Sequence, residues 1–338
     1  CLVGSEMCIR DSLTIVISAP YEEVLRVQTY HHMGVQKKAP SFEIAPAESG
    51  HLKAEDTEDK LVISSGTLRL EVQKENGALT FYRGEEKITA SGWRDLAYMK
   101  TDWKGFAYDK GPEDAYMREQ LSLSVGELIY GLGERFSAFV KNGQSVDIWN
   151  EDGGTSTEQS YKNIPFYISN KGYGVFVNHP ERVSFEVATE MVTKVEFSVP
   201  GENLDYFLIN GPTMKEVLMR YTDITGKPSL PAPWTFGLWL STSFTTNYDE
   251  KTVNSFVDGM FDRKIPLSVF HFDCFWMKDF NWCDFTWDSR VFPDPEGMLK
   301  RLKAKGLKIC VWINSYVGQE SSMFKEGVDC LLYTSPSP

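Results

Sequence analysis

The 338-residue sequence contains no apolar run as long as the roughly 18 residues that a membrane-spanning helix needs. Its first residues also lack the basic and then apolar layout of a secretory signal. Positive charge is scarce, because 35 lysines and arginines stand against 47 aspartates and glutamates, for a net charge of −12. Nucleic acids and anionic membranes need a basic surface, so neither is an expected partner. We therefore predict a soluble, cytoplasmic protein that acts on a neutral molecule.

Cysteine is sparse and is not arranged for metal binding. The six cysteines form no Cys-x-x-Cys pair, and no group of cysteines and histidines has the spacing of a zinc site. The simplest interpretation is a reducing compartment without disulfides, so we expect neither a metal site nor a disulfide. The cysteines are Cys1, Cys8, Cys274, Cys283, Cys310 and Cys330.

The two ends of the chain match no periodic pattern. Residues 1–12 and 330–338 show neither helical nor strand periodicity in register with their neighbours. Both segments resemble peptides translated from sequencing-adapter DNA. We expect them to be foreign or disordered, in which case three of the six cysteines carry no meaning.

Aromatic residues are abundant, at 13% of the chain with nine tryptophans. Rings at this density form large β-sheet cores or flat platforms that pack on sugars, and composition alone favours the cores. The length predicts about two domains, or one large barrel with an accessory domain.

The first two thirds of the sequence predict antiparallel strands. Short alternating apolar segments separated by turn residues recur from Leu13 to about Leu208. In one example, Thr67–Val72 is followed by an Asn76-Gly77 turn signal and a second alternating segment. Strands with this spacing are typical of a large antiparallel β-sandwich.

A helix and a linker end this part of the chain. The helix is expected to begin at Pro212 and to end at Gly226, with three prolines in the next few residues. We predict a β-sandwich domain over residues 13–225, whose start is expected to be missing, and a linker over 226–234. The predicted apolar face of the helix consists of Met214, Val217, Leu218 and Tyr221.

After the linker, strands and helices alternate. The predicted strands are almost wholly apolar, which indicates burial on both faces and parallel pairing. A doubly wound sheet and a (β/α)8 TIM barrel both fit this order. A complete barrel takes about 250 residues, so residues 235–329 would be the first three βα units of a truncated barrel. The expected strands are residues 235–240, 267–273 and 307–314, and the expected helices cover 253–261 and 294–305.

Polar and aromatic residues follow the predicted parallel strands, at the edge where active sites of such folds lie. The second strand ends in His271-Phe-Asp-Cys-Phe-Trp276. Carboxylates that accept hydrogen bonds from hydroxyls, among rings that pack on C–H faces, are typical of sugar binding. Asp273 is thus a candidate site residue, although a helix N-cap or a salt-bridged loop acid would also explain it.

Several blocks resemble the α-xylosidases of glycoside hydrolase family 31. In the β-domain they are Tyr130-Gly-Leu-Gly-Glu-Arg-Phe136 and Trp149-Asn-Glu-Asp-Gly-Gly-Thr-Ser-Thr-Glu158. In the barrel part they are Phe236-Gly-Leu-Trp-Leu, Ser243-Phe-Thr-Thr-Asn-Tyr, His271-Phe-Asp-Cys-Phe-Trp-Met-Lys and Gly306-Leu-Lys-Ile-Cys-Val-Trp-Ile-Asn314. The resemblance covers about residues 60–328. The pair Gly131-Leu-Gly133 lacks a third glycine and a following helix, so a dinucleotide site is not expected. The resemblance implies that these glycines permit a tight turn in the β-domain.

The resemblance implies a retaining α-glycosidase without metal or cofactor. Asp273 would bind hydroxyls of the sugar in the −1 subsite, and Asp152 would reach the barrel mouth on a loop, unless it is a plain turn residue. The bulk of Phe275 would fill the space of the C5 hydroxymethyl group, which glucose has and xylose lacks. The substrate would be a small α-xyloside or an oligosaccharide with terminal α-linked xylose. The implied wall of the subsite is Phe244, Cys274, Phe275 and Trp312.

The sequence departs from the family in one respect. Retaining hydrolysis needs two carboxyl groups about 5–5.5 Å apart, and the family places both aspartates on later barrel strands. No block resembles the family's Lys-Thr-Asp-Phe-Gly-Glu nucleophile segment, so we expect the chain itself to be inactive. A family 31 α-glucosidase or transglycosylase is the alternative enzyme, and a non-catalytic sandwich with a barrel stub is the alternative of another class. We expect the full-length parent to form a homo-oligomer.

Overall fold

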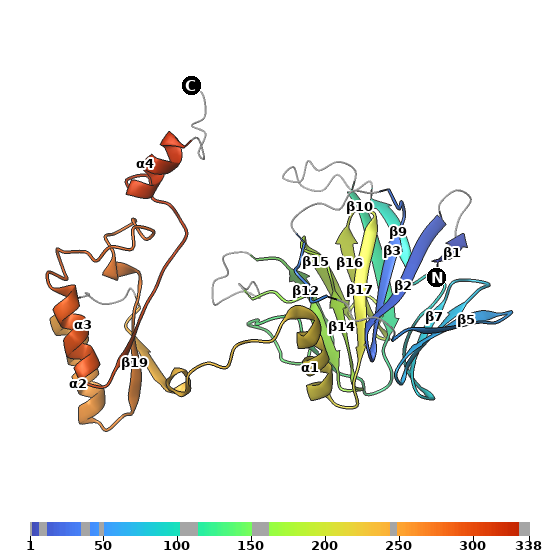
Figure 1. Cartoon of the computed structure of the whole chain (residues 1–338), viewed down its shortest axis with the longest axis horizontal. Helices are drawn as coiled ribbons and strands as arrows, with labels where there is room; N and C mark the ends of the chain where they lie inside the picture. The colour runs from blue at the N-terminus through green and yellow to red at the C-terminus, as the bar shows by residue number, and fades with distance from the viewer. Residues whose placement is uncertain are drawn as a thin grey trace. The chain divides into compact units, whose positions relative to one another are not determined.

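The structure is a computed structural model, and it describes residues 2–6, 12–34, 41–46, 51–101, 114–150, 162–243 and 249–330. The chain divides into two compact units, Cys1–Lys227 and Pro228–Pro338. Figure 1 labels many of the elements of both units. Among the described residues, no helix has the length and apolar character needed to cross a bilayer.

The described residues of the first unit form three antiparallel sheets. The seven-stranded sheet has the order β1 (Leu2–Glu6), β2 (Ser12–Tyr21), β3 (Val24–Tyr30), β17 (Asn203–Asn210), β14 (Tyr173–Val177), β13 (Phe166–Ser169) and β11 (Ile129–Gly131). A five-stranded sheet has the order β12 (Gln144–Ile148), β15 (Val183–Val187), β16 (Lys194–Pro200), β10 (Asp114–Ser122) and β9 (Ala97–Thr101). The other five-stranded sheet runs from β4 (Lys53–Asp56) through β5 (Lys60–Ser65), β6 (Leu68–Gln73) and β7 (Leu79–Arg83) to β8 (Glu86–Ser91).

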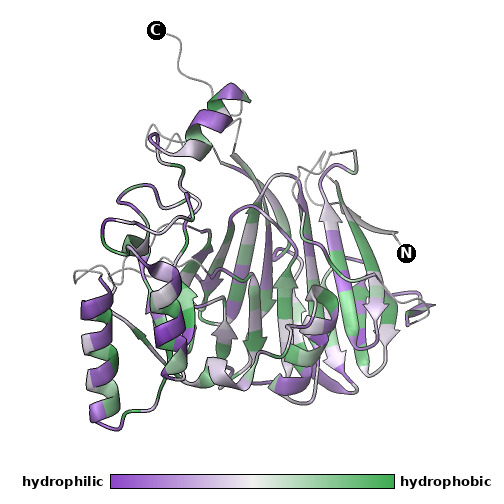
Figure 2. Cartoon of the chain, turned by 60° about the vertical axis from the view of Figure 1, so that its left-hand side comes forward, coloured by the Kyte–Doolittle hydropathy of each residue, from purple (hydrophilic) through white to green (hydrophobic). Residues whose placement is uncertain are grey.

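The main core of the first unit forms because its strands alternate between apolar and polar residues. In β16, Val195, Phe197 and Val199 are buried while the residues between them are half exposed. Figure 2 shows this alternation as bands of colour along the strands. Members of the core come from all three sheets, so the predicted antiparallel sandwich is confirmed as the architecture of this unit.

A second core lies beneath helix α1 (Met214–Thr225), on the other face of the seven-stranded sheet. Thr213 caps the helix in a reciprocal box with Glu216, so the helix begins two residues after Pro212. The predicted helix face is partly wrong, because Leu218 is 47% exposed whereas Ile224, which was not predicted, is buried. The face that α1 turns toward the sheet contains Met214, Val217, Tyr221 and Ile224.

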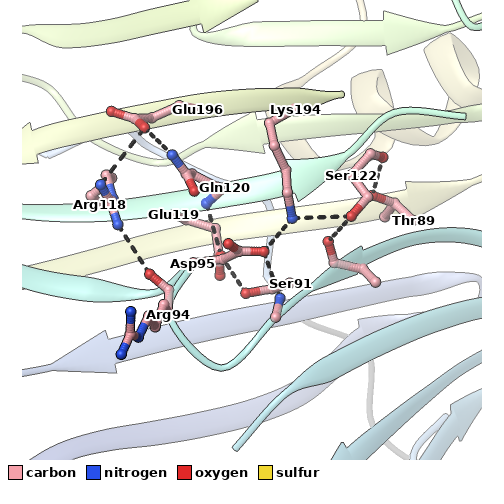
Figure 3. A network of polar contacts seen from close by, with 12 residues as sticks. Thr89, Ser91, Arg94, Asp95, Arg118, Glu119, Gln120, Ser122, Lys194 and Glu196 are labelled. Atoms are coloured by element: carbon pink, nitrogen blue, oxygen red, sulfur yellow. Dashed lines mark hydrogen bonds and ion pairs between the residues drawn. The ribbon is translucent and has the colours of Figure 1, made fainter. Parts of the chain in front are cut away.

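A buried carboxyl group joins the three sheets of the first unit. Glu119 of β10 accepts hydrogen bonds from Ser91 Oγ of β8 (2.6 Å) and from Tyr206 Oη of β17 (3.1 Å). Burial, despite these donors, raises the pKa of Glu119 to about 7. Figure 3 shows that Asp95 and Lys194 form an ion pair in the same network. Glu119 is thus a buried polar link between strands of all three sheets.

The beginning of the chain differs from the expectation that residues 1–12 belong to no element. Leu2–Glu6 forms β1, which pairs antiparallel with β2, and β2 itself begins at Ser12. The other segment for which disorder was expected begins at Cys330, which follows a helix that was not predicted, α4 (Ser322–Asp329). Residues 331–338 lie outside the described part of the chain.

The second unit contains a parallel three-stranded sheet with the order β18 (Leu238–Ser241), β19 (Leu267–Phe272) and β20 (Lys308–Val311). Helices α2 (Glu250–Asp262) and α3 (Pro295–Ala304) connect the strands, and Asp249 and Asp294 cap their N-termini. The predicted order of strands and helices, that of a partial TIM barrel, is therefore confirmed.

Two predicted details of the second unit are wrong. Residues 235 and 236 belong to a 3-10 helix, Pro233–Phe236 (η1), and the strand begins only at Leu238. Between them a Cβ on Gly237 would lie 2.0 Å from Ser268 Oγ, so the chain approaches β19 where only glycine fits. Burial on both faces also holds only for β19, since β18 and β20 have no buried residue.

Candidate functional site

The carboxyl ends of the three parallel strands meet at one edge of the sheet. Ser241 at the end of β18 pairs in register with His271, which in turn pairs with Cys310 of β20. The Nδ1 atom of His271 lies 3.3 Å from Ser241 Oγ. Phe272 ends β19, and its carbonyl oxygen accepts a 2.7 Å hydrogen bond from the backbone N–H of Trp312. The polar and aromatic residues that follow these strands therefore start from a common edge.

Asp273 is the first residue after β19. It is half-buried, and its Oδ1 atom accepts a 2.7 Å hydrogen bond from the backbone N–H of Cys274. Asp273 thereby caps a 3-10 helix, Cys274–Trp276 (η2). The local role considered from the sequence, that of an N-cap, is present. It fixes the direction of the side chain at the strand end and does not exclude a second role in binding.

The Cys274 thiol is unsuited to nucleophilic chemistry. The residue is buried, and burial raises the pKa of its thiol to about 11, with further contributions from the negative charge of Asp273 and a hydrogen bond to it. The group stays protonated at neutral pH. Cys274 therefore acts as a small neutral side chain beside Asp273.

Three aromatic side chains gather beyond the strand ends, and we call them the aromatic trio: Phe275, Trp282 and Trp312. Trp282 lies edge-on to both of its partners, with ring centroids 6.4 Å from Phe275 and 5.6 Å from Trp312. All three side chains are partly buried and pack against the main core of the second unit. The trio thus brings together residues that follow β19 and β20.

Trp276 links the two strand ends that carry Phe275 and Trp312. Its indole N–H donates a 2.7 Å hydrogen bond to the carbonyl oxygen of Trp312, so η2 is tied to the end of β20. Its own carbonyl oxygen accepts a 2.9 Å hydrogen bond from the N–H of Asp288, farther along the same loop. The buried Trp276 ring and the half-buried Trp287 ring pack against each other at 5.0 Å between ring centroids. The long loop after β19 therefore has a rigid base.

Two predicted site residues, Phe244 and Asp152, lie outside the described part of the chain. The residues that flank the Asp152 segment are described. Asn163 donates from Nδ2 to the carbonyl oxygen of Trp149 (2.9 Å) and to Oδ1 of Asn150 (2.7 Å). These hydrogen bonds hold the two ends of the segment together.

The structure places four of the six predicted residues at one edge: Asp273, Cys274, Phe275 and Trp312. Sequence reasoning missed Trp282 and the anchoring role of Trp276. Trp282 stands in a loop segment rich in charged and polar residues, and its aromatic character was the only signal there. In the described part of the chain, no group of three or more His, Cys, Asp or Glu side chains is placed to hold a metal ion.

Comparison with known proteins identifies the family. Residues 14–186 match the glycosyl hydrolase 31 N-terminal galactose mutarotase-like domain, and residues 228–335 match the glycosyl hydrolases family 31 TIM-barrel domain. Together with the parallel sheet and its sandwich partner, these matches show that the chain belongs to glycoside hydrolase family 31. The resemblance inferred from the sequence is confirmed.

Among curated relatives, the chain is similar to an α-xylosidase of Emericella nidulans, with 50% identity over 327 residues that cover 92% of this chain and 41% of that protein. It is also similar to the α-xylosidase XylQ of Lactiplantibacillus pentosus, with 48% identity over 94% of this chain and 40% of that protein. The chain therefore spans about two fifths of the length of these relatives.

Solved structures share the fold. A family 31 dextranase of Flavobacterium johnsoniae in complex with glucose matches with a TM-score of 0.81 and 20% identity, over 98% of this chain and 40% of that chain. A family 31 α-xylosidase from a soil metagenome in complex with xylose matches with a TM-score of 0.75 and 20% identity, over 96% of this chain and 49% of that chain. At this identity the likeness establishes the fold alone.

Proposed function

We propose that the protein to which this chain belongs is a retaining α-glycosidase that releases terminal α-linked xylose from oligosaccharides. The observation that carries this proposal is the position of Asp273. It lies at the carboxyl end of β19, shortly before Phe275 of the aromatic trio. The two relatives at 48–50% identity, both named as α-xylosidases, support the choice of sugar.

Each residue has a defined task in this proposal. The Asp273 carboxylate accepts hydrogen bonds from sugar hydroxyls, which are stronger than those between neutral groups because the acceptor is charged. The rings of Phe275 and Trp312 pack against the C–H faces of the sugar. Cys274 supplies a small neutral surface between the carboxylate and Phe275. Phe244 and Asp152 remain candidates from the sequence alone, because both lie outside the described residues.

The preference for xylose follows from the shape of one side chain. Glucose carries a hydroxymethyl group on C5 that xylose lacks, and Phe275 is proposed to occupy that space. Excluding one group of this size changes the relative transition-state stability by about 1–3 kcal/mol. A minor α-glucosidase activity is therefore part of the proposal.

The covalent chemistry is assigned to residues that this chain does not include. Retention of configuration needs a nucleophilic carboxylate and an acid/base about 5–5.5 Å apart. We propose that both are aspartates in the part of the relatives' length that this chain does not span, so we expect the chain by itself to be inactive. Asp273 is not the nucleophile in this scheme, because retaining hydrolysis needs a second carboxyl group nearby and the residues directly after β20 are Trp312, Ile313 and Asn314.

An α-glucosidase or transglycosylase is the second candidate. More distant relatives include an α-glucosidase of Saccharolobus solfataricus with 30% identity over 215 residues and an isomaltosyltransferase of Sporosarcina globispora with 27% identity over 281 residues. Xylose is favoured over glucose here because Phe275, next to Cys274, is proposed to fill the space of the C5 hydroxymethyl group. A clear glucoside preference would replace the first candidate by the second while leaving the family unchanged.

The test is a comparison of p-nitrophenyl α-xyloside with p-nitrophenyl α-glucoside, using the protein encoded by the complete reading frame. We expect kcat/KM to be higher for the xyloside. Asp273→Asn keeps an oxygen that can cap Cys274 but removes the charge, so it should fold normally and lose about 10- to 150-fold in kcat/KM. A change of less than about threefold would show that Asp273 serves as a cap alone.

Two further features belong to the proposal. We propose a cytoplasmic location, supported by the net charge of −12 and by free thiols at Cys274, Cys283, Cys310 and Cys330. We also propose that the full-length protein is a homo-oligomer, which sedimentation or size-exclusion measurements would test. No metal or cofactor enters the proposed chemistry.

A further inference from the structure

Trp282 occupies a place in the second unit that neither the sequence reasoning nor the family match assigns. Its indole ring meets Phe275 at an interplanar angle of 68° and Trp312 at 90°, so it lies edge-on to both. Phe275 follows β19 and Trp312 follows β20. Trp282 therefore connects the two aromatic residues that are proposed to line the sugar pocket.

The turn that carries Trp282 is held in place by packing on its other side. The N–H of Asn281 donates to the carbonyl oxygen of Lys278 (3.0 Å), and the N–H of Asp284 donates to that of Asn281 (3.1 Å). A Cβ on Gly318 would lie 2.4 Å from the carbonyl oxygen of Phe280 and 3.2 Å from Asn281 Oδ1. The segment after β20 thus presses against this turn where only glycine leaves enough room.

The neighbours of Trp282 in sequence also fix its orientation. Asn281 is 4% exposed and Cys283 is 2% exposed, so both flanking side chains are buried. The indole Nε1 atom is buried too, and among the described residues no group accepts a hydrogen bond from it. Burial of its neighbours and of its own ring nitrogen therefore restricts the movement of the Trp282 ring.

We infer that Trp282 is a positioning residue that holds the Phe275 ring in the orientation that excludes a C5 hydroxymethyl group. The inference rests on the proposed function, because it concerns the preference of that site for xylose. A phenyl ring can rotate about two side-chain bonds, and only a ring fixed in one orientation excludes a group of this size. Edge-on contact with Trp282 on its fixed turn supplies that restraint.

The inference predicts a selective effect on one substrate. When Trp282 is shortened, the Phe275 ring gains freedom and the pocket accepts glucose more readily. The kcat/KM for the glucoside should rise, whereas that for the xyloside should change little. A merely structural defect would lower both values together and leave their ratio unchanged, so the ratio separates the two roles.

The experiment is a double-mutant cycle in the full-length protein with Trp282→Leu, Phe275→Ala and the combination of both. We expect Trp282→Leu to lower the ratio of kcat/KM for the xyloside to kcat/KM for the glucoside by about fivefold to tenfold. One misfit group changes such a ratio by roughly 10- to 200-fold in all, and Trp282 should account for a part of it. Because Trp282 acts through Phe275, the double variant should have the same ratio as Phe275→Ala alone. Trp282→Phe, which keeps an aromatic edge, should restore most of the ratio.

Phe280→Leu is the matched control. Phe280 also contacts the Trp282 ring, at 5.6 Å between centroids, but is 76% exposed. Its substitution should leave the ratio unchanged. If Trp282→Leu fails to fold, the same cycle with Trp282→Met, a flexible side chain that fills space but has no ring, carries the test.

Two results would overturn the inference. One is an unchanged ratio in Trp282→Leu while Phe275→Ala lowers it. The other is additivity of the two substitutions, which would mean that Trp282 contacts the sugar directly. A wild-type enzyme without any preference for the xyloside would instead refute the proposed function and would be seen before any variant is made.

Discussion

The two units differ in how completely their sheets are covered. In the first unit, β13 and β14 are buried along their whole length, with the main core on one face and the core beneath α1 on the other. In the second unit only β19 is mostly buried, while Leu238 and Trp239 of β18 are 43% and 41% exposed. Parallel sheets are ordinarily covered on both faces. The first unit is therefore self-sufficient in packing, whereas the second presents apolar strand surface to solvent.

The largest expected effect is a difference between the two units expressed separately. Residues 12–227 should be soluble and should unfold in one cooperative transition, because their apolar strands are covered. Residues 228–330 should aggregate, since β18 and β20 leave strand edges and apolar side chains exposed among the described residues. Size-exclusion chromatography and thermal unfolding followed by circular dichroism would measure both. A soluble, monomeric second unit would contradict the claim that its sheet is less completely covered than those of the first unit.

The next effect tests whether the face beneath α1 is closed. Phe207 is 1% exposed and packs on Phe176 at 5.8 Å between ring centroids. Phe207→Ala should lower the free energy of unfolding of residues 12–227 by about 3–5 kcal/mol. Leu218→Ala on the outer side of the same helix is the control, with an expected change within about 0.5 kcal/mol. Urea denaturation would give both values, and similar losses would mean that α1 is rotated differently.

A smaller effect concerns a tight turn in the first unit. Gly131, Leu132 and Gly133 all have positive φ, and a Cβ on Gly133 would lie 2.0 Å from the carbonyl oxygen of Lys162. Gly133→Ala should therefore cost about 3 kcal/mol, from backbone strain and the clash together. Gly143→Ala also has positive φ but has no atom within 4 Å of the added Cβ, so it should cost about 1 kcal/mol. Equal losses would show that the approach of residues 131–134 to 162–167 is looser than described.

The smallest expected effect is on the pH dependence of the first unit. Burial raises the pKa of Glu119 to about 7 in the folded state, above its ordinary value of 4.5. The folded state therefore binds this proton more tightly than the unfolded state, and stability should fall as pH rises from about 4.5 to about 7. Glu119→Gln, which cannot ionise, should remove about 1–3 kcal/mol of this decline. Unfolding measured between pH 4.5 and 8 would test it, and an unchanged slope would refute the assignment.

The sequence predicted the order of elements well because their signals are local. Alternation along Lys194–Val199 needs only the strand's own residues, and Asp294, Pro295 and Gly306 mark the beginning and end of α3 without reference to the rest of the fold. Burial was predicted less well. Leu218 and the residues of β18 are apolar, but whether they are covered depends on neighbouring elements that a single segment does not specify.

The candidate site was predicted where residues follow a strand directly and was missed where tertiary contacts decide. Asp273, Cys274 and Phe275 come straight after an apolar strand, so the sequence placed them at the edge of the sheet. Trp282 stands seven positions after Phe275 in an irregular loop, and tertiary contacts such as that of Gly318 with the same loop hold it beside Phe275 and Trp312. Such contacts between two loops leave no periodic trace in the sequence.

The central claim, that the carboxyl edge of β18–β20 is a xylose pocket, is tested most directly by a crystal structure of the full-length protein with bound xylose. The distances from the Asp273 carboxylate oxygens to the xylose hydroxyls are the decisive quantities. The account predicts at least one distance of about 2.6–3.2 Å, with the Phe275 ring beside C5 of the sugar. Xylose bound elsewhere, or an Asp273 side chain engaged solely with the N–H of Cys274, would contradict it.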